Sequence, residues 1–217
     1  MNEVVPKFQD SLFTGLSNVI PDIAELGIDS ILNEGILKDI PVVSVLLGVK
    51  NTAQSLHDRN LLRQTLAFID EFNKGNIDEE KKQKYKKKIE DNPKKAEAEL
   101  GRVLIILNQT IELDKSKILA SIFRAYVNEK IDWKIFCEFS EITRLFFVSD
   151  FYDLKCIYYH DSEVVELSYG IDRLAALGLV KITTNPEIVS GGLGSRRSVE
   201  LSRIGGFYYS LVAETIS

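Results

Sequence analysis

Cysteine and histidine are scarce in this chain, and their scarcity excludes several classes of protein. The 217 residues include 2 Cys, 2 His, 1 Met and 1 Trp. Two cysteines exclude a disulfide scaffold and a four-cysteine zinc site. His57 and His160 are far apart in sequence, and the chain has no His-x-x-x-His or Cys-x-x-Cys pair to hold a metal. Cys156 and His160 lie four residues apart and suggest a nucleophile pair, but a structural role is the simpler interpretation. We therefore expect no metal, no cofactor, no small-molecule substrate and no enzymatic activity.

Proline and glycine are also infrequent, with 5 Pro and 13 Gly. Hydrophobic residues make up 45% of the chain and charged residues 27%, a balance typical of globular proteins rather than of fibrous or disordered chains. The net charge of -5 argues against a protein that coats nucleic acid generally.

Long apolar runs are missing as well. The longest, Ile40 to Val49, is about half the length of roughly twenty residues that a membrane-crossing helix requires. The segment Met1 to Val5 lacks the basic residues of an export signal and contains Glu3. We therefore expect no conventional transmembrane helix and a cytoplasmic location.

The hydrophobic pattern divides the chain into three parts. We predict an amphipathic N-terminal helical segment over 1–52, a helical bundle over 53–155 and a winged-helix-like domain over 156–217. The expected fold class is mostly α, a helical bundle with a small C-terminal winged-helix-like α+β module. In the first part, apolar residues recur at helical spacing: Phe8, Leu12, Leu16, Val19, Ile23 and Leu26.

The second part reads as consecutive helices with short connections. Asp78, Asp114 and Asp132 each stand where a helix N-cap is expected, and Gly75 suits a left-handed C-terminal position. The run Val103 to Leu107 is too apolar for a surface strip, which predicts a helix buried at the centre of the bundle.

The third part changes character. We expect a helix over 163–177 that Gly178 ends, a strand over 179–184 and a loop over 190–195. A returning strand over 197–201 and a helix over 202–214 complete the second half of a winged helix.

Two segments of this part carry a resemblance to known proteins. Leu174-Ala-Ala-Leu-Gly-Leu-Val180, followed by Val199-Glu-Leu-Ser-Arg-Ile-Gly-Gly206, resembles the ending of bacterial winged-helix domains. The rest, including Ile40-Pro-Val-Val43 and Asp58-Arg-Asn-Leu-Leu62, is similar to uncharacterised bacterial helical proteins, some of which lie among mobile elements and phage-defence genes. The resemblance implies a defence setting. We expect a protein-interaction or self-association module that forms a homo-oligomer, in a regulatory or defence setting.

DNA binding through the winged helix is the alternative from a different class. Arg196, Arg197, Arg203 and Lys181 are the candidate contacts to phosphates. The helix that would read the DNA carries four carboxylates against Arg173 alone, namely Asp161, Glu163, Glu166 and Asp172. Phosphate would repel such a face, so packing is the preferred interpretation of this helix.

A lysine tract over 81–88 is the second basic feature. Tyr85 and Ile89, four residues apart, are the predicted inner face of its helix. Nearby acidic residues favour a solvated surface. If the tract binds an anionic ligand, such as a lipid surface or RNA, Lys82, Lys86 and Lys87 are the candidates.

The first part leaves a further alternative open. Val42, Val45 and Leu46 would enter a membrane if the amphipathic segment were a latent membrane-active element. Packing of this segment on the bundle is preferred, because its own charge is acidic.

Overall fold

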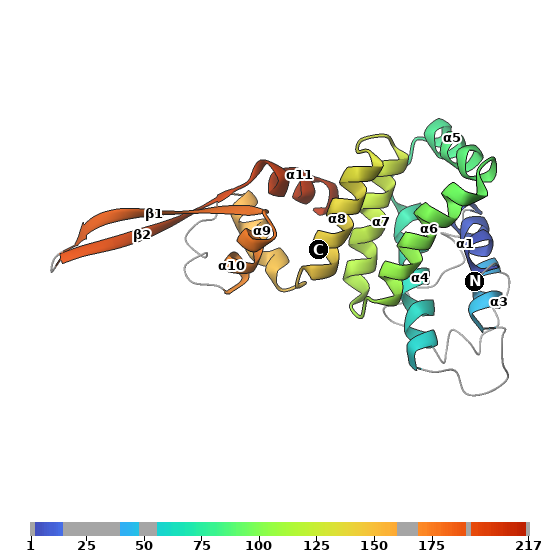
Figure 1. Cartoon of the computed structure of the whole chain (residues 1–217), viewed down its shortest axis with the longest axis horizontal. Helices are drawn as coiled ribbons and strands as arrows, with labels where there is room; N and C mark the ends of the chain where they lie inside the picture. Colours follow the sequence, from blue (N-terminus) through green and yellow to red (C-terminus); the bar gives the residue numbers. More distant parts are fainter. Residues whose placement is uncertain (1–2, 15–39, 48–55, 160–168, 190–191, 216–217) are drawn as a thin grey trace. The chain divides into compact units, whose positions relative to one another are not determined.

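The chain is mostly helical, with a small two-stranded antiparallel sheet near the C-terminus and a helix after it (Figure 1). A computed structural model describes residues 3–14, 40–47, 56–159, 169–189 and 192–215. Within these ranges there are ten helices, α1 (Val4–Phe13), α3 (Pro41–Leu47), α4 (Leu56–Lys74), α5 (Glu79–Glu90), α6 (Pro93–Asn108), α7 (Leu113–Val127), α8 (Trp133–Leu145), α9 (Asp150–Tyr158), α10 (Tyr169–Ala176) and α11 (Arg203–Val212). The strands are β1 (Val180–Val189) and β2 (Gly192–Leu201).

Backbone contacts divide the chain into two compact units, Met1–Ser140 and Glu141–Ser217. The division falls within α8. The boundaries predicted from sequence pattern, 52/53 and 155/156, stay predictions.

Local side-chain chemistry sets the helix starts in the first unit. Asp78 and Asp132 accept hydrogen bonds from the backbone N–H groups of Lys81 and Ile135, so both predicted caps are confirmed. The prediction for Asp114 is wrong. Helix α7 begins at Leu113, two residues earlier than a cap at Asp114 would allow, and Asp114 lies in its first turn, where a carboxylate still opposes the helix dipole.

An aromatic core holds the first unit together. Its rings meet at tilted, edge-on and stacked angles, with centroids 4.8–6.4 Å apart. The members come from α1, α4, α5, α7 and α8 and are Phe8, Phe13, Phe68, Phe72, Tyr85, Phe123, Tyr126, Trp133 and Phe136. Phe123 contacts Phe68, Phe72 and Phe136, which places α7 at the centre of this core.

Helix α6 is less buried than its sequence predicts. Val103 and Leu107 are fully buried, but the Ile105 side chain between them is 57% exposed. A helix turns about 100° per residue, so five consecutive apolar residues cannot all face one core. The predicted position at the centre of the bundle is therefore wrong, and α7 occupies it instead.

In the second unit, α10 leads through a tight turn into the hairpin. Gly178 has φ +75°, a left-handed conformation that favours glycine, so the predicted helix stop is confirmed. The Leu179 N–H donates to the Leu174 carbonyl at 2.9 Å and closes the turn. Residues 163–168 of the predicted helix lie outside the described residues.

The hairpin is longer than predicted. Its strands pair from Val180↔Leu201 to Val189↔Gly192, so most of the expected loop over 190–195 is strand. Pro186 lies within β1. A two-stranded sheet consists of edge strands only, and a proline whose nitrogen faces outward costs no ladder hydrogen bond there.

Helix α11 packs closely on the start of the hairpin. The Ser202 Oγ accepts the Gly205 N–H at 2.8 Å and caps the helix. A Cβ atom at Gly205 would lie only 1.9 Å from the Leu179 carbonyl oxygen, so only glycine fits here. Tyr208 is fully buried, and its hydroxyl lies 3.0 Å from that of Thr143.

Candidate functional site

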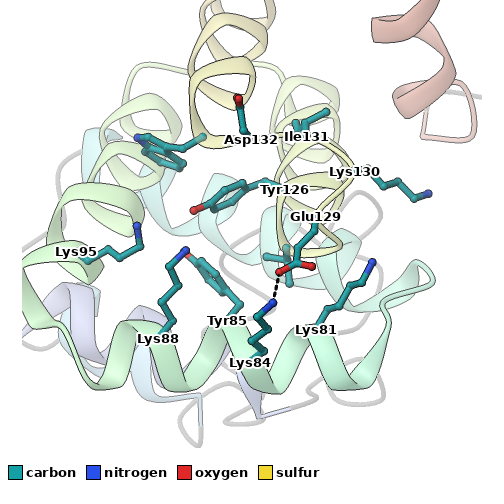
Figure 2. A pocket seen from close by; sticks show the side chains of 12 residues that line it. Lys81, Lys84, Tyr85, Lys88, Lys95, Tyr126, Glu129, Lys130, Ile131 and Asp132 are labelled. Atoms are coloured by element: carbon teal, nitrogen blue, oxygen red, sulfur yellow. Dashed lines mark hydrogen bonds and ion pairs between the residues drawn. The ribbon is translucent and has the colours of Figure 1, made fainter.

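A hollow of about 460 Å³ lies beside α5 in the first unit. Its lining comes from α5, α6, the end of α7, the turn that follows and the first residue of α8. It consists of Lys81, Lys84, Tyr85, Lys88, Lys95, Tyr126, Val127, Glu129, Lys130, Ile131, Asp132 and Trp133. Five lysines and two carboxylates give this lining a positive balance. Figure 2 shows that Lys88 and Lys95 point toward the middle of the hollow, whereas Lys130 points away.

Asn128, at the end of α7, holds the start of α5 in place. Its side-chain oxygen accepts the Asp78 N–H at 3.0 Å, and its amide nitrogen donates to the Asn76 carbonyl at 3.1 Å. Its own carbonyl accepts the Lys81 Nζ at 2.9 Å. Because this residue ties the α5 cap to the end of α7, the lysines at positions 81, 84 and 88 face the hollow.

Glu129 has an unusual backbone for its residue type. Its φ is 56°, and it is the only residue other than glycine in the described part of the chain with a positive φ. Its carboxylate accepts a hydrogen bond from the Lys84 Nζ at 2.7 Å, drawn as a dashed line in Figure 2. This contact raises the pKa of Lys84 and lowers the pKa of Glu129, so the pair stays charged at neutral pH.

A buried carboxylate lies next to the hollow. Glu99 accepts hydrogen bonds from the Tyr85 hydroxyl at 2.8 Å and the Tyr126 hydroxyl at 2.9 Å, and Lys95 Nζ lies 2.6 Å from it. Burial, with the charge of Glu99 as a second cause, raises the pKa of both tyrosines. Both tyrosine hydroxyls and the Glu99 carboxylate have partners, so the network fixes these side chains beside the hollow.

The lysines that the sequence analysis selected lie on other sides of α5. Lys82 Nζ donates to the Asn73 side chain at 3.4 Å, Lys86 Nζ lies 3.9 Å from Glu90, and Lys87 is exposed. None of the three lines the hollow. The predicted inner face of Tyr85 and Ile89 is confirmed, since both are at most 5% exposed.

A second candidate surface lies on α11 in the second unit. The side facing its own unit carries Tyr208, Tyr209 and Val212, all buried. Three further apolar side chains share a neighbouring side of the helix. Ile204 is 51% exposed, Phe207 is 43% exposed and Leu211 is half-buried. The helix is therefore apolar on two sides, and Arg203 and Glu214 at its two ends are exposed.

Exposed apolar side chains are concentrated in this unit. Of ten large hydrophobic residues that are exposed in the described part of the chain, seven belong to Glu141–Ser217. They are Leu145, Phe147, Tyr152, Tyr159, Tyr169, Ile204 and Phe207.

The candidate DNA contacts are only partly described. Arg196 and Arg197 pair with Asn185 and Thr184 in the hairpin, and the structure describes their backbone alone. Lys181 and Arg203 are exposed near the base of the hairpin.

Arg173, the one basic residue predicted on α10, binds a carboxylate of its own unit. Arg173 Nε donates to the Asp150 carboxylate at 2.8 Å, and its guanidinium lies 4.8 Å from the centre of the Phe147 ring. Asp172 is exposed, while Asp161, Glu163 and Glu166 lie outside the described residues.

The predicted membrane residues form part of α3. Val42 is fully buried, and its N–H donates to the Ser11 Oγ of α1 at 2.9 Å. Val45 and Leu46 are half-buried. In the part of the chain that is described, no helix has the length and apolar character needed to cross a bilayer.

No cluster of three or more His, Cys, Asp or Glu side chains that could hold an ion occurs within the described ranges. Cys156 is buried and Cys137 half-buried, and His160 lies outside those ranges.

Comparisons with protein-family models, with curated proteins and with solved structures find no match to this chain. The resemblance to winged-helix domains and to uncharacterised bacterial helical proteins stays a prediction.

Proposed function

We propose that this protein is a non-enzymatic self-association module, and that its second unit is a winged-helix-like domain used for packing. The order α10, β1, β2, α11 supports the winged-helix interpretation. The regulatory or defence setting rests on the sequence resemblance alone.

The outward apolar side of α11 carries this proposal. The helix already buries one apolar side in its own unit, and yet Ile204 and Phe207 stay exposed to water and Leu211 is half-buried. Exposed apolar surface of this kind, with charged residues at its ends, is typical of a protein interface.

Charge at the ends of α11 favours a second copy of the same chain as the partner. In a two-fold symmetric pair with antiparallel α11 helices, Arg203 of one copy faces Glu214 of the other, twice over. The same residues of both copies would then form an isologous interface.

Measurement of molar mass by light scattering tests the proposal. We expect a dimer for the natural protein and a monomer for Ile204→Glu, because the new carboxylate would be desolvated in the interface. Ser210→Glu, on another side of the same exposed helix, is the matched control and should remain dimeric.

A charge exchange identifies the geometry. Arg203→Glu and Glu214→Arg should each weaken the dimer by about fivefold, and the double exchange should restore it, because the opposite charges then face each other again. A monomer at all concentrations, or a dimer that Ile204→Glu does not weaken, would overturn the proposal.

The weaker alternative, DNA binding, rests on the exposed Lys181 and Arg203 near the hairpin base. Retention of duplex DNA that is lost when Arg196 and Arg197 are both replaced by Ala would favour it. The acidic Asp172 and the engaged Arg173 on α10 argue for packing instead.

A further inference from the structure

We infer that the hollow beside α5 is a binding site for a small molecule that carries a chain of phosphate groups. Lys81, Lys84, Lys88, Lys95 and Lys130 contribute to its lining. Lysine ammonium groups bind phosphate oxygens strongly through charge-assisted hydrogen bonds. The inference is independent of the self-association proposed for the second unit.

The lysines next to the hollow differ in how far they are already engaged. Lys95 neutralises the buried Glu99, and Lys81 donates to the Asn128 carbonyl. The Lys88 ammonium makes no hydrogen bond or ion pair to any described residue, and it points toward the middle of the hollow (Figure 2). Lys88 is therefore the cation most available to an incoming anion.

Glu129 already places an anion at the edge of the hollow. Its carboxylate binds Lys84, although its left-handed backbone is a conformation that costs a residue with a side chain about 1 kcal/mol. The chain thus positions a carboxylate where a phosphate group of the ligand would bind. Displacement of Glu129 by the ligand would release Lys84 to the phosphate chain.

Size and lining favour a small molecule over a polymer. A volume of about 460 Å³ lies within the range of ligand pockets, whereas a nucleic acid strand needs an extended groove. Tyr126 and Trp133 add aromatic surface to the lining, on which the ring of a nucleotide could lie. The phosphate chain could belong to a nucleotide or to inorganic polyphosphate, and the experiment separates these sources.

Trp133 is the chain's one tryptophan and lines the hollow, so its fluorescence reports on the site directly. Titration with inorganic triphosphate should change this emission saturably, and added salt should weaken the binding. Titration calorimetry with ATP then tests whether the adenine ring contributes to binding. Tighter binding of ATP than of triphosphate identifies a nucleotide, and equal binding identifies the phosphate chain alone.

Variants on both sides of α5 make the test specific. Lys88→Gln should weaken triphosphate binding about tenfold, since one charge-assisted contact is lost. Lys87→Gln removes the same charge from an exposed position outside the hollow and should change binding little. Both substitutions are at the surface, so circular dichroism should show both variants folded.

The carboxylate of Glu129 provides a variant that should bind triphosphate more tightly. Glu129→Gln should tighten triphosphate binding several-fold because it removes the competing anion, whereas Glu90→Gln, with the same charge change away from the hollow, should not. Equal losses for Lys88→Gln and Lys87→Gln would overturn the inference, as would the absence of saturable binding. Tighter binding of a single-stranded RNA oligomer than of ATP would overturn it too.

Discussion

At the scale of single residues, the most constrained group is the buried carboxylate of Glu99. It is 2% exposed and accepts hydrogen bonds from two tyrosines, with Lys95 as its counter-ion. A buried charge is tolerated only when it is paired and hydrogen-bonded, and here both conditions hold. Tyr85 and Tyr126 also belong to the aromatic core, so the network joins α5, α6 and α7.

Replacing Glu99 should therefore destabilise the first unit. Glu99→Gln removes the charge that Lys95 neutralises and places an amide donor among three donors, so we expect a loss of about 1–3 kcal/mol in the free energy of unfolding. Urea denaturation followed by Trp133 fluorescence measures this loss. Glu97→Gln, exposed on the same helix, should change it by less than about 0.5 kcal/mol. Equal effects of the two substitutions would contradict the structural role of the network.

At the scale of elements, two glycines on helices have opposite surroundings. At Gly205 of α11, a Cβ atom would meet the Leu179 backbone, while at Gly101 of α6 it would meet nothing within 4 Å. The first glycine permits close packing of a helix on a hairpin. The second is a flexible residue inside a helix without a packing reason.

These surroundings predict that alanine at the two positions changes the stability in opposite directions. Gly205→Ala should destabilise the protein by about 2–3 kcal/mol, because a backbone carbonyl cannot move aside as a flexible side chain can. Gly101→Ala should stabilise it by about 0.5–1 kcal/mol through helix propensity. Urea denaturation followed by circular dichroism compares the two. A neutral Gly205→Ala would mean that α11 does not approach the hairpin as closely as described.

At the scale of the whole molecule, buried tyrosines are present in both units. Burial raises the pKa of Tyr85 in the first unit and of Tyr208 in the second above the ordinary value of 10.0. A buried tyrosine stays neutral in the folded state, whereas in the unfolded chain it ionises near pH 10. The unfolded state thus loses protons that the folded state keeps.

The stability contributed by these tyrosines should be complete below about pH 10 and should fall as the pH rises above it. The urea midpoint should therefore be lower at about pH 11 than at about pH 9, and phenolate absorbance should appear together with unfolding. Tyr208→Phe should reduce the pH dependence, because it removes one of the linked groups. The exposed Tyr169→Phe is the control and should leave it unchanged. A midpoint that does not change between the two pH values would contradict the linkage.

Local chemistry was enough to predict many elements from the sequence. Asp78 and Asp132 cap helices because their carboxylates reach N–H groups only three residues away, and Gly178 ends α10 because only glycine adopts its φ readily. Prediction failed where a residue far away in sequence determines the local structure. Gly75 was assigned a left-handed role, yet its φ is not positive, and a Cβ atom there would collide with the Arg124 guanidinium, 49 residues along the chain.

The basic site shows the same limit. Sequence alone determined that α5 is a lysine-rich helix with Tyr85 and Ile89 inward, since helical periodicity is a local property. Lysines follow on both flanks of that inner face, and the pattern does not distinguish one flank from the other. Only the tertiary structure decided that Lys81, Lys84 and Lys88 line the hollow together with the α7–α8 turn. The reason is that Asn128 holds the start of α5 through hydrogen bonds between residues about 50 positions apart in sequence.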